Sequence, residues 1–120
     1  MKFALIAVLL SSIGLVNVAN AANIEKGKAL VERGNCASCH GAGLNAPIMP
    51  AYPKLAGQYP DYLYYALKAY EVGNSNHLYG RNNATMSSLI KAQATPLTDQ
   101  DLRDIAAYIA SLPGTLVVKK

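Results

Sequence analysis

Cysteine is scarce in this chain of 120 residues, with only two, and both lie in the run GNCASCHGAG at residues 34–43. At most one disulfide bond is therefore available to stabilise a small domain. Basic charge is not concentrated either: the formal net charge is +4, but no block of Lys and Arg stands out, which argues against a nucleic-acid binder. No segment alternates apolar and polar residues between hairpin turn signals, so we predict an all-α fold.

Long apolar runs are also few, and the clearest stands at the N-terminus. Lys2 precedes the run FALIAVLL at residues 3–10, and a weaker apolar stretch then ends in Ala-Asn-Ala. This pattern is typical of a secretory signal peptide cleaved after Ala21. A retained membrane anchor is the alternative, but polar residues interrupt the run before it reaches the roughly 20 residues that a bilayer needs. We predict a signal peptide over residues 1–21 and one exported, periplasmic domain over residues 22–120.

Three segments carry the period of amphipathic helices together with start and stop signals. They cover residues 24–33, 60–72 and 98–112, and Thr98 with Asp101 forms a capping-box-like start for the third. We expect a shorter turn at residues 88–92. The domain is thus predicted to have three main helices.

Two long irregular stretches separate these helices. Residues 34–59 hold both cysteines with several glycines and prolines, and residues 73–87 are rich in Asn and Gly. Loops of this length are uncommon in a compact domain unless they bind something or are disordered. Three helices and two such loops make a poor core by themselves, so we expect a large apolar group to complete it.

The chemistry of the chain is concentrated in Cys36-Ala-Ser-Cys39-His40. Two thiols at this spacing can add to the two vinyl groups of a haem, and the adjacent imidazole can reach its iron. Other interpretations compete: a zinc site would need a fourth ligand, for which only His77 is available, and a thioredoxin-like pair would need a βαβ unit that is not visible. A structural disulfide would leave His40 without a role. The motif favours one haem c, attached through Cys36 and Cys39.

The other side of the iron has several candidate ligands: Met49, His77, Met86, or none. Met49 follows His40 closely in the same loop and is more naturally a core filler. His77 is more naturally a solvated loop histidine. Met86 stands beyond the middle helix, in a polar loop that can approach the opposite face, so we favour His40 and Met86 as the metal ligands.

The chain resembles the class I c-type cytochromes, specifically the short periplasmic mono-haem kind that is also found as single domains of di-haem cytochromes. The resemblance covers nearly all of residues 22–120. It rests on four stretches: CASCHG at 36–41, YPKLAGQ at 52–58, GRNNATM at 80–86 and LTDQDLRDIAAYIASL at 97–112. Residues 73–80 form a longer stretch than is usual in this family, which keeps His77 open as an alternative ligand.

The resemblance implies a small cytochrome c fold, with three main helices and long loops wrapped around one covalent haem. It implies that the first and last helices cross closely at Gly27. It also implies that the Pro53 carbonyl holds the second nitrogen of His40 and that Leu55 presses on the haem face. Arg81 either approaches a haem propionate or is an ordinary surface arginine. Several tyrosines are expected to wall the haem: Tyr52, Tyr59, Tyr64, Tyr65 and Tyr79.

An iron with His and Met on both axial positions has no vacant site, and such a centre passes single electrons. We therefore expect an electron carrier of the periplasm or respiratory chain and not an enzyme, working as a monomer or weak dimer. Its partners would be redox proteins, an electron donor and an acceptor, including membrane-bound complexes. The alternative is a haem-based sensor or peroxidase-like enzyme whose sixth ligand is displaceable.

Overall fold

The computed structural model describes residues 21–93 and 95–116. The predicted signal peptide lies outside these residues except for its last residue, Ala21. The described chain is helical and contains no strand, as the sequence predicts. Its helices are α1 (Ile24–Arg33), α2 (Ala37–His40), α3 (Pro60–Val72), α4 (Ala84–Lys91) and α5 (Asp99–Ser111), with short 3-10 turns at Ala42–Leu44 and Gly73–Ser75.

The three predicted main helices are confirmed as α1, α3 and α5. Two further helices differ from the prediction. The cysteine motif forms α2 inside a stretch that the sequence analysis leaves irregular, and α4 begins at Ala84, four residues before the expected turn at residues 88–92. The side chain of Asn83 explains the earlier start, because its oxygen accepts the N–H of Met86 at 2.9 Å and so caps the helix.

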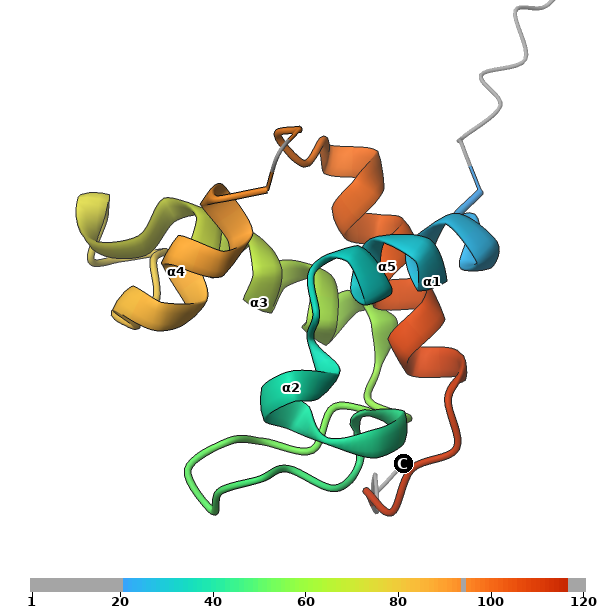
Figure 1. Ribbon diagram of the computed structural model, residues 1–120. Helices are drawn as coiled ribbons and strands as arrows, with labels where there is room; N and C mark the ends of the chain where they lie inside the picture. The colour runs from blue at the N-terminus through green and yellow to red at the C-terminus, as the bar shows by residue number, and fades with distance from the viewer. Residues whose placement is uncertain (1–20, 94, 117–120) are drawn as a thin grey trace, which may run out of the picture.

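The close crossing of α1 and α5 depends on Gly27, as the resemblance implies. A Cβ atom at Gly27 would lie 2.0 Å from the carbonyl oxygen of Asp104 and 2.9 Å from Cβ of Tyr108. Asp104 is itself buried and accepts the backbone N–H of Asn23, the N-cap of α1, at 2.8 Å. The two helices are in contact, and they cross on the right of the view in Figure 1.

The start of α5 carries the predicted capping box. Thr98 N–H donates to Asp101 Oδ2 at 2.8 Å, and Asp101 N–H donates to Thr98 Oγ1 at 3.1 Å. Lys26 of α1 also pairs with Asp101 Oδ1 at 2.6 Å. The hydrogen bond from Lys26, followed by the one from the Thr98 backbone, lowers the pKa of Asp101 below its ordinary value.

The hydrophobic core lies where α1, α3 and α5 meet. Its buried members are Leu30, Val31, Leu44, Leu63, Tyr64, Leu102, Ile105, Ala106 and Ile109. The Tyr64 hydroxyl donates to Asp99 Oδ1 at 2.6 Å, and the guanidinium of Arg103 lies 4.1 Å from the centre of the Tyr64 ring. This network fastens α3 to α5. None of the helices in the described part of the chain is long and apolar enough to cross a membrane.

Candidate functional site

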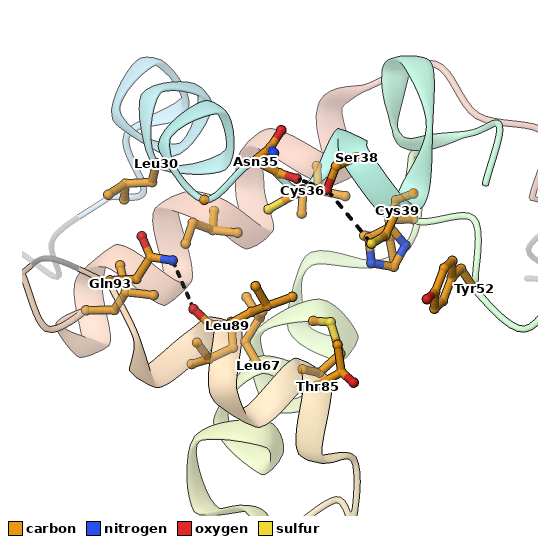
Figure 2. Close-up of a pocket in the computed structure, with 18 of the residues that line it drawn as sticks. Leu30, Asn35, Cys36, Ser38, Cys39, Tyr52, Leu67, Thr85, Leu89 and Gln93 are labelled. Atoms are coloured by element: carbon orange, nitrogen blue, oxygen red, sulfur yellow. Dashed lines mark hydrogen bonds between the residues drawn. The ribbon is translucent and has the colours of Figure 1, made fainter. Parts of the chain in front are cut away.

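A deep, mostly apolar hollow lies between α2, α4 and the core helices, and it encloses about 950 Å³ free of protein atoms, part of it open to solvent. Among the residues that the structure describes, no Asp, Glu, Lys or Arg lines it. The lining residues are Leu30, Gly34, Asn35, Cys36, Ser38, Cys39, His40, Tyr52, Leu55, Leu67, Asn83, Thr85, Met86, Leu89, Ile90, Gln93, Leu97, Ile105 and Ile109. In Figure 2, Cys36 and Cys39 lie on the side of the hollow opposite Leu67, Leu89 and Thr85.

The two cysteines reach the hollow from α2 and its N-cap, Cys36, and a short turn that starts at Gly34, the C-cap of α1, connects the two helices. Asn35 makes this turn with a left-handed backbone (φ 50°), and its carbonyl accepts the Ser38 hydroxyl at 2.8 Å. Cys36 is the N-cap of α2 and Cys39 lies within the helix, three residues later. At this spacing the two side chains lie on one face of the turn. Both are free thiols and partly buried, and burial raises the pKa of the Cys36 thiol.

The imidazole of His40 is buried, with 6% of the residue exposed, and it also lines the hollow. Its Nδ1 lies 2.7 Å from the carbonyl oxygen of Pro53. Because a carbonyl can only accept, Nδ1 carries a proton, and in the neutral imidazole Nε2 then has the lone pair. The structure therefore leaves one ring nitrogen of His40 available to ligate a metal.

The loop after α2 folds back to bring Pro53 under His40. Gly41 makes the first turn with φ 79°, and a Cβ there would lie 1.6 Å from the carbonyl oxygen of Ala46. Leu44 then accepts the backbone N–H of Leu55 at 2.8 Å. The same turn places Leu55 in the wall of the hollow; its contact with the haem face stays a prediction.

Met86 lies in α4 and lines the hollow. Met86 and His40 therefore line the same cavity, although they belong to two different helices. Met49 does not reach the hollow; it is 49% exposed, which makes the core-filler interpretation of this residue wrong. His77 is exposed, as expected for a solvated loop histidine, and it lines a separate hollow with Gly73 and Gly80.

Arg81 lies outside the hollow. Its guanidinium donates to the Tyr62 hydroxyl at 3.2 Å and to the Tyr70 hydroxyl at 3.4 Å, and its approach to a haem propionate stays a prediction. Of the five tyrosines expected to wall the haem, Tyr52 alone lines the cavity. The expectation is wrong for the others because they have different surroundings: Tyr64 is buried in the core, and the rest are exposed, namely Tyr59, Tyr65 and Tyr79.

The sequence analysis missed most of the wall that α4 supplies. Met86, Leu89 and Ile90 stand at positions i, i+3 and i+4, which is the spacing of one helix face. Read together with Asn83 as an N-cap, this spacing was the available signal for a helix starting at Ala84. Leu67 of α3 and Gln93 complete the wall near α4.

The donor set suits a covalently attached haem: two thiols on one face of a turn, an imidazole with a free nitrogen, a thioether, and a lining without charge. The sequence profile of the cytochrome c family matches residues 24–113. The chain belongs to this family, which confirms the prediction of a class I c-type cytochrome with a cytochrome c fold. Family membership implies covalently bound haem c, and Cys36 and Cys39 are the only cysteines in the sequence.

Several individual proteins are similar to this chain. Cytochrome c4 of Stutzerimonas stutzeri is 38% identical over 112 residues, which cover 90% of this chain and 50% of the relative. Cytochrome c-554(548) of Halomonas halodenitrificans is 40% identical over 78 residues, covering 65% of this chain and 84% of that protein. The crystal structure of reduced recombinant cytochrome c4 from Pseudomonas stutzeri matches with a TM-score of 0.66 and 34% identity, over 80% of this chain and 48% of that chain. The chain thus spans about half the length of the cytochrome c4 proteins it matches.

Proposed function

We propose that this protein is an exported, periplasmic electron carrier in which His40 and Met86 are the two axial ligands of the haem iron. The observation that carries the proposal is that both side chains line the same uncharged hollow as Cys36 and Cys39. Haem c, when bound, supplies a one-electron couple at its iron. If His40 and Met86 both ligate the iron, it would keep no coordination position for oxygen or substrate, so we expect transfer of electrons without further chemistry.

In this proposal each residue of the site has a separate task. Cys36 and Cys39 hold the cofactor, and the Pro53 carbonyl fixes the tautomer and orientation of His40. Leu55 and the apolar residues of α4 and α5 exclude water from the centre. A thioether ligand raises the reduction potential relative to a second imidazole, because it stabilises the reduced iron.

The partners would be redox proteins that approach the surface around α2. The residues exposed there carry no charge: Ala37, Ser38, Ala42 and Ala46 are small, and Ile48, whose N–H donates to the carbonyl of Cys39, is apolar. A partner can therefore come close over a small interface. The scattered basic residues would steer an acidic donor or acceptor, including a membrane-bound complex, and added salt would weaken that steering. We propose that the carrier is a monomer or weak dimer.

The test compares Met86→Ala with the matched control Met49→Ala, since Met49 is the exposed methionine outside the hollow. Both proteins would be exported from a host that matures c-type cytochromes. Met86→Ala should retain covalent haem but lose the methionine-to-iron charge-transfer band, lower its potential and bind carbon monoxide rapidly when reduced. Met49→Ala should match the wild type in all three measurements.

Two outcomes would contradict the proposal. If Met86→Ala leaves spectrum and potential unchanged, Met86 is not a ligand. If the reduced wild type itself binds carbon monoxide rapidly, the sensor or peroxidase-like alternative is favoured. The mass of the exported protein adds an independent check, because it should equal residues 22–120 plus one haem; a chain retaining residues 1–21 would contradict the predicted cleavage.

A further inference from the structure

Arg81 attaches the segment that carries Met86 to α3 through both its main chain and its side chain. The backbone N–H of Arg81 donates to the carbonyl of Ala69 at 2.9 Å. Its guanidinium bonds to the hydroxyls of Tyr62 and Tyr70, and its Cζ atom lies 5.6 Å and 5.3 Å from the centres of their rings. Main chain and side chain of Arg81 therefore both attach this segment to the same helix.

The attachment continues from Arg81 to Met86 through short-range hydrogen bonds. Asn83 N–H donates to the carbonyl of Arg81 at 3.0 Å. The side-chain oxygen of Asn83 accepts the N–H of Met86 at 2.9 Å, which sets Met86 in the first turn of α4. The helix α4 packs on α3, and in Figure 1 it lies beside α3 and away from α1 and α5. The position of Met86 relative to the hollow is thus decided by how α4 is held on α3.

The loop before this attachment gives little support of its own. Leu78 is 82% exposed and Tyr79 is 73% exposed, so neither packs against the body of the protein. A guanidinium held between two phenol rings, by contrast, resists displacement through both hydrogen bonding and cation–π attraction. After Gly80, whose N–H donates to the carbonyl of Asn76 at 2.8 Å, Arg81 attaches this exposed loop to α3.

We infer that Arg81, clasped by Tyr62 and Tyr70, is the positioning residue that keeps Met86 in the hollow and so controls how readily a small molecule displaces the sixth ligand. This inference rests on the proposed ligation by Met86. It assigns Arg81 a task other than binding a propionate.

The test replaces Arg81 by Met and, separately, Tyr62 and Tyr70 by Phe in one double variant. The double variant keeps the charge and both rings and removes only the two hydroxyl acceptors. Arg103→Met is the matched control, because Arg103 also lies over a tyrosine ring on α3 but belongs to α5 and does not touch the segment before α4. All variants are studied as the haem-bearing protein.

We expect carbon monoxide to bind reduced Arg81→Met at least tenfold faster than the wild type. A tenfold change corresponds to a loss of about 1.4 kcal/mol in the free energy that holds Met86 on the iron. The double variant should show a smaller increase in the same direction. Amide exchange in peptides spanning residues 82–91 should accelerate in both, and the methionine-to-iron band should weaken. Arg103→Met should leave all three measurements near the wild type, even if it lowers the melting temperature.

The results separate this inference from the proposed function. If Met86→Ala abolishes the methionine-to-iron band but Arg81→Met and the double variant behave like Arg103→Met, the inference is wrong and the ligand assignment stands. If Met86→Ala changes nothing, the proposed ligation by Met86 is wrong, and the inference about Arg81 is overturned with it. Should Arg81→Met not yield folded protein, the double variant decides: an unchanged rate of carbon monoxide binding overturns the inference.

Discussion

Replacing Gly27 by Ala tests whether the crossing of α1 and α5 is as tight as the structure has it. In an exposed helix this change would stabilise by about 1 kcal/mol, because Ala has the higher helix propensity. Here the added Cβ would lie 2.0 Å from the carbonyl oxygen of Asp104, an atom of the backbone that cannot rotate away. The helices would have to separate, and overpacking of this kind costs about 1–3 kcal/mol or more.

The separation would also weaken contacts that depend on the crossing, including the bond from Asn23 N–H to Asp104. We therefore expect Gly27→Ala to lower the free energy of unfolding by about 2 kcal/mol net, or the melting temperature by about 10 °C in a domain of this size. The measurement is denaturant unfolding of the haem-bearing protein, followed by far-ultraviolet circular dichroism.

The control for this prediction is Lys28→Ala, a change at the exposed neighbouring position of the same helix. It should alter the free energy of unfolding by no more than about 0.5 kcal/mol. If Gly27→Ala proves as stable as the wild type, or more stable through its helix propensity, the crossing is looser than 2.0 Å implies and the argument from close approach is refuted.

Two further predictions concern pH and the cofactor. Because the pKa of Asp101 is lowered in the folded state by Lys26 and the Thr98 backbone, this carboxylate stabilises the fold above its unfolded pKa of about 3.9, and the stabilisation is lost as the pH falls through the lower folded value. Asp101→Asn should therefore reduce the free energy of unfolding more at pH 7 than at pH 3; an equal loss at both would show that the charge is not responsible. Cys36→Ala/Cys39→Ala protein, which cannot attach haem, should show no cooperative thermal transition by circular dichroism, because the hollow leaves a large part of the apolar lining unpacked; a sharp transition would contradict this.

The parts of the fold that depend on local signals were predictable from the sequence. The spans of α1 and α3 agree with their patterns of apolar residues, and the capping box of Thr98 and Asp101 marks the start of α5 correctly. A capping box joins a side chain to a backbone group three residues away, so it can be recognised from one short stretch of sequence. The same holds for Cys36, Cys39 and His40, whose spacing alone indicates the cofactor.

Other features required the three-dimensional arrangement. The guanidinium of Arg81 could be assigned to its tyrosines only once α3 was placed beside the loop, since Tyr62 stands nineteen residues away in sequence. Met49 and Met86 look equally suited to a core by residue type, yet one is exposed and the other lines the hollow. Among the tyrosines, the resemblance predicted a shared role, whereas packing separates Tyr52 from the rest.

The sequence by itself determined the family, the helical class and the point of haem attachment, because each follows from residues close together in the chain. The tertiary structure decided which of the distant side chains share one hollow with that point, and that Arg81 is turned toward Tyr62 and Tyr70. The physical reason is that contacts between remote segments depend on how whole helices pack, and packing is a property of the assembled surfaces, which no short stretch of sequence contains.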